Sequence, residues 1–237
     1  MKKSAKILTL AVALAAGFGS STAQAADDLK IGADLVSSYV WRGIEYGNSA
    51  AVQPAVSYAI PGTSAVVGAW GSYALVADAG ARYQELDPYI TLSAGQFSLT
   101  VTDYYTQQDP DLPRTHTDAT KTFDFKKGGP NSVETILTYS AGDLSLTGAM
   151  YVGGNTNENA KYCEASYGFY SKDKVTAKFT VGGGSRGYYG DLNDTSSSYN
   201  SIRLTNVGFT VTKDRYSVSY VLNPDTEKSH LIFMASF

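Results

Sequence analysis

The chain has 237 residues, a formal net charge of −3 and 17% charged residues, with 23 Gly, 18 Tyr and one Cys. An acidic chain repels a phosphate backbone, which argues against a nucleic-acid partner, and a single cysteine, Cys163, excludes an intramolecular disulfide framework. No segment beyond residue 25 approaches the ~18 unbroken apolar residues that a membrane helix requires. Any membrane span must therefore be built from strands.

The first 25 residues have the pattern of a secretory signal peptide. A lysine-rich start is followed by a short apolar stretch over residues 7–18, and Ala23-Gln24-Ala25 is an A-x-A cleavage site. We therefore expect residues 1–25 to be removed and residues 26–237 to form the mature domain. Roughly 210 residues suit one domain.

Apolar and polar residues alternate along the rest of the chain, and this period of two predicts about twelve strands. The predicted strands cover residues 29–41, 50–60, 64–75, 83–94, 97–106, 132–141, 144–153, 161–171, 174–183, 200–212, 215–223 and 228–237. Most are close to the roughly 9–11 residues that a tilted strand needs to cross a bilayer. The alternation changes phase near Asn206, which predicts a β-bulge there.

The connections between the predicted strands alternate in length. Short turns are expected at residues 61–63, 95–96, 142–143, 172–173 and 213–214, and longer links at 42–49, 76–82, 107–131, 154–160, 184–199 and 224–227. This alternation is typical of an outer-membrane barrel, whereas a soluble β-sandwich gives no reason for it. We expect an all-β fold, a transmembrane antiparallel up-and-down β-barrel of about 12 strands with short periplasmic turns and longer extracellular loops.

In such a barrel the apolar face of each strand contacts lipid and the polar face lines the lumen. Aromatic residues near predicted strand ends are candidates for the interfacial girdles: Tyr39, Trp41, Tyr73, Tyr105, Tyr151 and Tyr216. Ordinary aromatic packing is the alternative for each of them.

The last predicted strand ends on an aromatic residue. Leu231, Phe233, Ala235 and Phe237 share one face, and His230 lies on the other. This ending resembles that of bacterial outer-membrane barrels, and the resemblance implies that Leu231, Phe233 and Phe237 form an assembly signal read by the barrel-assembly machinery.

Four short motifs near the start of the predicted barrel form an ordered set. They are Ser38-Tyr39-Val40-Trp41-Arg42-Gly43-Ile44, Gln53-Pro54-Ala55-Val56-Ser57-Tyr58, Gly68-Ala69-Trp70-Gly71-Ser72 and Glu85-Leu86-Asp87-Pro88-Tyr89. In this order they resemble the TorF family of Gram-negative outer-membrane porins, whose function is largely unknown. The resemblance implies a barrel in the cell outer membrane and porin-like transport, and it supplies no catalytic or ligand-binding residues.

Twelve tilted strands enclose a backbone cylinder roughly 24 Å across, which leaves a passage on the order of 8–10 Å or none. Strand parity predicts these pore-lining residues: Lys30, Asp34, Arg42, Glu85, Asp87, Glu134, Glu164, Lys178, Arg215 and His230. A cross-strand ion pair between Glu164 and Lys178 is a further expectation. Opposed charges of this kind either set selectivity in a hydrated lumen or form a salt-bridged plug.

The favoured function is therefore a passive, porin-like channel for ions or small hydrophilic solutes, in contact with outer-membrane lipid and lipopolysaccharide. A closed structural or surface-interaction barrel is the alternative, and a lipid-modifying enzyme is a more distant one. Only His116 and His230 could act as a histidine base, and neither is expected on the lipid-facing wall beside a serine. We expect no enzymatic activity, no cofactor and no metal site.

Overall fold

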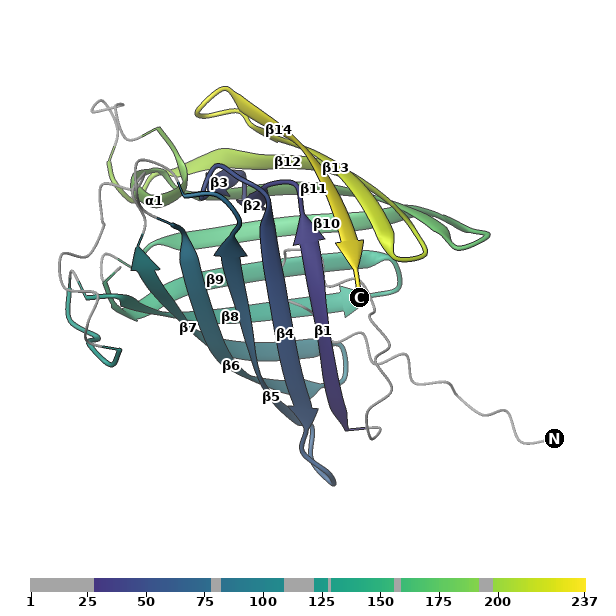
Figure 1. Cartoon of the computed structure of the whole chain (residues 1–237), viewed down its shortest axis with the longest axis horizontal. Coiled ribbons are helices and arrows are strands. Elements are labelled where there is room, and N and C mark those ends of the chain that lie inside the picture. Colours follow the sequence, from purple (N-terminus) through teal and green to yellow (C-terminus); the bar gives the residue numbers. More distant parts are fainter. Residues whose placement is uncertain (1–27, 78–81, 109–121, 128, 156–158, 192–197) are drawn as a thin grey trace.

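The computed structural model describes residues 28–77, 82–108, 122–127, 129–155, 159–191 and 198–237. The predicted signal peptide and most of the predicted 107–131 link, including His116, lie outside these residues. Within the described residues, twelve antiparallel strands form one closed barrel (Figure 1). The strands are β1 (Leu29–Val36), β4 (Ala51–Ala59), β5 (Ala65–Ala74), β6 (Gln84–Ala94), β7 (Phe97–Gln108), β8 (Asn131–Ala141), β9 (Leu144–Gly154), β10 (Lys161–Lys172), β11 (Val175–Ser185), β12 (Ile202–Lys213), β13 (Tyr216–Asn223) and β14 (Lys228–Ser236).

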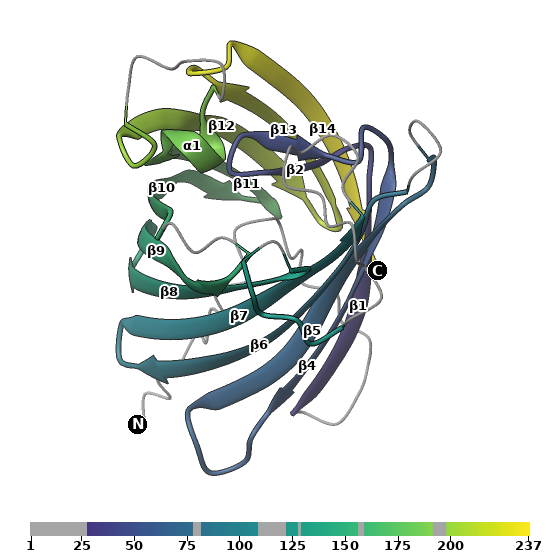
Figure 2. The ribbon, with the colours of Figure 1, turned by 90° about the vertical axis from the view of Figure 1, so that its left-hand side faces the viewer.

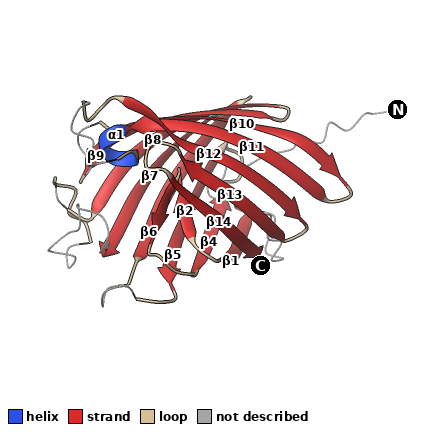
Figure 3. Cartoon of the chain, turned by 90° about the horizontal axis from the view of Figure 1, so that it is seen from above, coloured by secondary structure: helices blue, strands red, loops and turns tan. Residues whose placement is uncertain are grey.

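The barrel closes between its first and last strands, which lie side by side in Figure 3. On one edge of β1, Asp34 is paired with Ser236 and Val36 with Met234 of β14. On the other edge, Asp34 is paired with Gln53 of β4. Each strand is therefore hydrogen-bonded on both sides, as a closed sheet requires. The predicted fold class, a closed antiparallel barrel of twelve strands, is confirmed.

Tight turns join the strands at one end of the barrel, which we call the turn end, and longer connections join them at the other, the loop end. Left-handed residues make the tight turns possible: Gly95 and Gly142 both have φ of +59°, and Asp173 and Lys174 have +51° and +63°. Asp173 and Lys174 are both left-handed, whereas Gly95 and Gly142 are each the left-handed first residue of their turn; both kinds of turn match the twist of a two-residue hairpin. The predicted segregation of short and long connections is present in the described residues.

The outer wall of the barrel is apolar. Large hydrophobic side chains on nearly every strand point outward and are exposed, among them Ile31, Leu35, Val56, Val67, Leu86, Ile90, Leu99, Leu137, Leu146, Val152, Tyr167, Phe179, Val181, Phe209, Val218, Leu231 and Phe233. A soluble monomer rarely exposes a contiguous apolar patch beyond a few hundred Å². The wall as a whole has the polarity of a surface that contacts lipid.

Adjacent residues at the centre of β10 allow a matched test of this wall. Tyr167 faces outward and is 54% exposed. Ser166 faces the lumen, where its hydroxyl donates a hydrogen bond to the Glu164 carboxylate at 3.4 Å. A lysine near the bilayer midplane costs about 2–4 kcal/mol on the lipid face and much less in the lumen. We expect Tyr167→Lys to lower the urea midpoint of the refolded barrel strongly and Ser166→Lys to leave it nearly unchanged. Equal losses for the two variants would contradict a lipid-facing outer wall.

The first predicted strand is shorter than expected, and this is the main difference from the sequence prediction. It ends at Val36, and residues 39–46 form a separate two-stranded sheet of β2 (Tyr39–Trp41) and β3 (Ile44–Tyr46). We call residues 37–50 the inner hairpin. Figure 2 shows it extending from the β1 side across the barrel toward α1 (Arg186–Tyr189).

The inner hairpin also corrects the predicted aromatic girdle. Tyr39 and Trp41 are each 5% exposed and Tyr151 is 1% exposed, so these three rings are buried inside the barrel. Tyr73 and Tyr216 are exposed, as a girdle residue must be. The prediction was wrong for Tyr39 and Trp41 because the chain leaves the barrel wall after Val36, and for Tyr151 because it alternates with the outward-facing Met150 and Val152 and so points inward.

The predicted bulge near Asn206 is confirmed. The register between β11 and β12 shifts between Gly182 and Gly183, which are paired with Asn206 and Leu204. Thr205 is the extra residue, so the chain changes phase there and both Thr205 and Asn206 are buried. The carbonyl of Thr205 is thereby brought to the tip of the inner hairpin, as described below.

Candidate functional site

The tip of the inner hairpin is a two-residue turn made by Arg42 and Gly43, with Trp41 paired to Ile44 across it. Both turn residues are left-handed, with φ of +52° at Arg42 and +84° at Gly43. This is the hairpin turn in which Asn-Gly is favoured, since a residue with a long side chain is strained at positive φ. The turn holds Arg42 in a strained conformation that directs its side chain into the lumen.

Gly43 lies against the barrel wall at β12 and β13. A Cβ atom at this position would overlap the backbone carbonyl oxygen of Thr205 and would lie 3.4 Å from Cβ of Asn223. The Asn223 side-chain amide donates to the carbonyl oxygens of Gly43, at 3.3 Å, and Tyr189, at 3.1 Å. The inner hairpin therefore leaves the wall at β1, and its tip contacts β12 and β13 directly.

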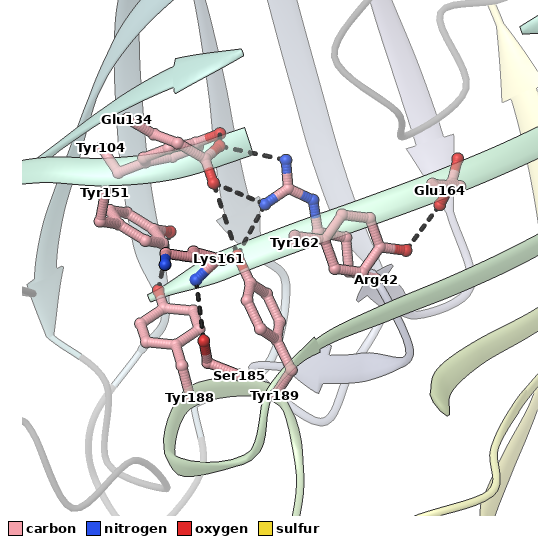
Figure 4. Close-up of polar contacts among 10 residues, drawn as sticks. All are labelled: Arg42, Tyr104, Glu134, Tyr151, Lys161, Tyr162, Glu164, Ser185, Tyr188 and Tyr189. Atoms are coloured by element: carbon pink, nitrogen blue, oxygen red, sulfur yellow. Dashed lines mark hydrogen bonds and ion pairs between the residues drawn. The ribbon is translucent and has the colours of Figure 1, made fainter. Parts of the chain in front are cut away.

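A buried ion pair joins the tip to the far wall, as Figure 4 shows. The Arg42 guanidinium donates from Nη1 to Glu134 Oε1 at 2.6 Å and from Nη2 to Oε2 at 3.1 Å. Nη1 also donates to the Tyr189 hydroxyl at 2.6 Å, and the Tyr104 hydroxyl donates to Glu134 Oε2 at 2.8 Å. The bidentate geometry matches the fork of a guanidinium to the two oxygens of a carboxylate.

Aromatic rings enclose this ion pair. The guanidinium carbon of Arg42 lies 4.2 Å from the ring centroid of Trp41 and 4.3 Å from that of Tyr162, within the range of a cation–π contact. Further ring contacts connect Trp41 to Tyr104, at 5.5 Å, and to Tyr189, at 5.9 Å. The buried aromatic cluster is completed by Tyr39, Tyr46, Trp70, Tyr83 and Tyr151.

The environment keeps the Arg42 guanidinium charged. Burial, the largest single influence, lowers the pKa of Arg42, but the Glu134 carboxylate and the Tyr189 and Tyr104 hydroxyl groups together outweigh it and hold this pKa well above its usual range. Burial raises the pKa of the Tyr189 phenol well above its usual range, although Arg42 opposes this shift. Tyr189 therefore stays a neutral hydroxyl that accepts a hydrogen bond from Arg42.

A second polar network lies on β10 and β12, next to the ion pair. The Glu164 carboxylate accepts from the Tyr162 hydroxyl at 2.6 Å and from the Asn206 amide at 2.9 Å. The predicted Glu164–Lys178 pair is wrong, because Glu164 is paired with Gly182 and Lys178 with Gly168. A separation of four residues along a strand is about 13 Å, too far for a salt bridge.

The base of the inner hairpin is also fixed to the wall. The Ser38 hydroxyl donates to Glu45 Oε1, and Glu45 Oε2 lies 3.6 Å from Nδ1 of His230 on β14. The Ser38–Glu45 bond lies within the hairpin, whereas the contact from Glu45 to His230 and the bond from the Phe233 backbone N–H to the Ser37 hydroxyl oxygen, at 2.9 Å, join the hairpin to β14, the strand that closes the barrel. The inner hairpin is thus held at its base and at its tip.

Toward the turn end, below the hairpin, the inner wall carries mainly hydroxyl groups. Cross-strand hydroxyl pairs join Thr91 to Thr100 at 2.8 Å, Thr138 to Thr147 at 3.3 Å and Thr210 to Ser219 at 2.9 Å. Hydroxyl groups both donate and accept hydrogen bonds, so this part of the lumen is suited to water and polar solutes.

The predicted pore-lining residues fall into three groups. Asp34, Asp87 and Glu134 are buried on inward-facing strand positions, and Glu85, Glu164 and His230 are half-buried. Lys30 and Lys178 are exposed near the turn end. Arg42 and Arg215 are not on barrel strands: Arg42 is at the hairpin tip, and Arg215 lies in the turn before β13, with its guanidinium 6.0 Å from the ring centroid of Phe237. Leu231, Phe233 and Phe237 face outward and are exposed.

Several residues of the site were not identified from the sequence. Tyr104, Tyr162, Tyr189, Asn206 and Asn223 carry hydrogen bonds of the central networks. Arg42-Gly43 was the one local signal for the site. A polar residue followed by glycine, with short apolar runs on both sides, is consistent with a two-residue turn. Strand parity places Tyr104 and Tyr162 on inward faces, as it does Glu164, but Tyr189 lies outside the predicted strands and has no such signal.

Within the described residues, no helix is long and apolar enough to cross a membrane. In the same part of the chain, no group of three or more His, Cys, Asp or Glu side chains is arranged to hold a metal ion.

Comparisons with known proteins leave the family open. No model of a known protein family matches the chain, and no curated protein matches it. One solved structure, described as "Unveiling the Mechanism Behind the in-meso Crystallization of Membrane Proteins", is similar over 89% of this chain and 82% of that chain, at 10% sequence identity and a TM-score of 0.46. A similarity at this identity and TM-score assigns no family, and the resemblance to the TorF family stays a prediction.

Proposed function

We propose that the chain is an outer-membrane barrel whose lumen is closed at the loop end by the inner hairpin, and that it conducts ions or small hydrophilic solutes when this hairpin is displaced. The proposal replaces a permanently open porin by a gated one. It assigns the loop end to the cell exterior and the turn end to the periplasm.

The membrane location is supported by the contrast between the two walls. Exposed aliphatic and aromatic side chains cover the outside, whereas hydroxyl groups and charged groups line the inside. Below the buried aromatic cluster, this is the reverse of a soluble protein, in which apolar side chains gather in the interior. Outer-membrane lipid and lipopolysaccharide are the expected surroundings of the outer wall.

The observation that carries the gate is the bidentate ion pair between Arg42 and Glu134. It lies inside the lumen, it is buried, and it joins a segment inserted between β1 and β4 to β8 on the far wall. A segment of this kind can leave the lumen without breaking any barrel strand, because Val36 and Ala51 are already paired directly across its base. The barrel can therefore open while its sheet stays closed.

Planar-bilayer recording of the purified, refolded protein tests the proposal. We expect long closed periods with brief openings for the wild-type chain. Permanent conductance at the level of an unobstructed barrel would contradict the gate. Heat-modifiable mobility on a gel is measured on the same sample, because it shows that the barrel is folded.

A closed barrel without transport is the second candidate. It is favoured by the contiguous packing of Tyr39, Trp41, Tyr46, Tyr104 and Tyr189, which fills the loop end with rings. The two candidates differ in one result: a closed barrel stays silent in the recordings even when the ion pair is broken.

We also propose that the chain is not a lipid-modifying enzyme. His230 belongs to the inner face of β14, where its Nδ1 faces Glu45. A histidine base in the lumen cannot reach a lipid ester at the outer wall.

A further inference from the structure

We propose that the position now filled by the Arg42 side chain is a binding site for solutes that carry a guanidinium group, and that such a solute displaces the inner hairpin by competing with Arg42. We call the residues that surround this position, other than those of the hairpin, the Glu134 site: Glu134, Tyr104, Tyr162 and Tyr189. The inference rests on the gate proposed above and adds the chemical class that operates it.

The Glu134 site belongs to the barrel and not to the hairpin. Glu134 comes from β8, Tyr104 from β7, Tyr162 from β10 and Tyr189 from α1. The Glu134 side chain is 0% exposed, and its cationic partner Arg42 is supplied by the hairpin. When the hairpin leaves, the Glu134 carboxylate loses this cationic partner and can pair with another cation.

The geometry of the Glu134 site favours a guanidinium over an ammonium group. The carboxylate accepts two parallel N–H bonds, the Tyr189 hydroxyl accepts a third, and the ring face of Tyr162 lies 4.3 Å from the guanidinium carbon. A planar fork satisfies all of these partners at once, whereas an ammonium is a point charge that cannot donate as a fork. A neutral urea has the shape but lacks the charge.

Arg42 is an imperfect occupant of the Glu134 site, which makes competition possible. Its backbone is held at φ of +52°, and its buried Nε atom has no hydrogen-bond partner. A free solute carries no backbone strain and can turn so that each N–H is satisfied. The tethered arginine has the advantage of high local concentration, so we expect displacement only at millimolar solute.

Arg42→Gly provides the direct test of the Glu134 site. Glycine suits the left-handed φ of position 42, so the variant removes the side chain without adding strain. We expect methylguanidinium to raise the unfolding temperature of this variant saturably, with half-saturation on the order of a millimolar. Methylammonium is expected to act at least roughly tenfold more weakly, and urea not at all.

The double variant Arg42→Gly with Glu134→Gln is the matched control and is expected to show no stabilisation by methylguanidinium. If Arg42→Gly does not refold, the barrel in which residues 37–50 are replaced by a short glycine-rich turn carries the same Glu134 site and takes its place. An equal response to all three probes, or an unchanged response in the double variant, would overturn the site.

The wild-type chain tests the competition separately. We expect millimolar methylguanidinium to increase the open time in planar bilayers, and methylammonium to leave it near its starting value. Binding in Arg42→Gly without opening of the wild-type chain would contradict displacement while leaving the site intact. If removal of the hairpin changes the conductance but methylguanidinium binds neither to Arg42→Gly nor to the barrel without residues 37–50, the gate is retained and the guanidinium site is refuted.

Discussion

Glu134→Gln is expected to open the barrel. The substitution keeps the size of the side chain but removes its charge, and its amide nitrogen presents a donor where Arg42 and the Tyr104 hydroxyl already donate. Arg42 is then a buried charge without a partner. In planar-bilayer recordings we expect the open fraction to rise by roughly a hundredfold or more over the wild-type chain.

The size of this effect follows from the burial of the pair. Removing one partner of a buried ion pair costs about 3–5 kcal/mol, and each 1.4 kcal/mol changes an equilibrium about tenfold. The cost falls on the closed state alone, because Arg42 reaches water once the hairpin has left. The barrel itself is expected to keep its heat-modifiable mobility, since its strands do not depend on the pair.

Replacing both partners separates the lost charge from lost packing. Arg42→Met together with Glu134→Leu removes both charges and leaves apolar side chains of similar length, which often restores the stability of a buried site. We expect this double variant to be closed for more of the time than Glu134→Gln alone. An open fraction in Glu134→Gln equal to that of the wild-type chain would show that the ion pair does not hold the gate.

Gly43→Ala is expected to open the barrel without changing any charge. Its Cβ atom would overlap the Thr205 carbonyl oxygen, which is backbone and cannot rotate away, and φ at this position is +84°. The hairpin tip then cannot reach its place beside β12 and β13, so the bond from Asn223 and the Arg42–Glu134 pair are lost together. We expect an open fraction at least as high as in Glu134→Gln.

Gly62→Ala is the matched control. Gly62 also has a left-handed φ, of +75°, but a Cβ atom there meets nothing within 4 Å. Alanine costs about 1–2 kcal/mol at either position for the backbone, and only Gly43→Ala adds the overlap with Thr205. Similar recordings for the two variants would mean that the hairpin tip does not need close contact with the wall.

The barrel could be predicted from the sequence because its strands obey one simple rule. Val175, Phe179 and Val181 alternate with Thr176, Lys178 and Thr180, and this period of two gives the outer and inner faces of the barrel opposite polarities. The phase change near Asn206 identified the bulge by the same rule. Each strand contains enough alternating residues for the pattern to stand out.

The inner hairpin could not be predicted in this way. Tyr39, Val40 and Trp41 continue the pattern of β1, so spacing alone extends that strand to residue 41. What ends the strand is the tertiary contact of these rings with Trp70, Tyr104 and Tyr189, which come from distant parts of the chain. Alternation shows which residues share one face of a strand, but it does not show whether that face contacts lipid or packed side chains in the lumen.

The candidate site was predicted in part for a related reason. Parity placed Glu134 on the inner wall, and Arg42 was named as a residue facing the lumen, but nothing in the sequence paired them across 92 residues. The predicted Glu164–Lys178 pair was wrong because register, which parity does not fix, sets which residues lie opposite each other. The sequence named Glu134 and Arg42 as candidates, but it did not show that they pair.

The most direct test compares the wild-type chain with a barrel that lacks the inner hairpin. Residues 37–50 are replaced by a glycine-rich turn of about two to five residues, which the direct pairing of Val36 with Ala51 permits. Single-channel recording in planar bilayers is expected to show a mostly closed wild-type chain and steady conductance for the shortened one. Equal conductance of the two folded proteins, whether both are silent or both are open, would contradict a gate formed by this hairpin.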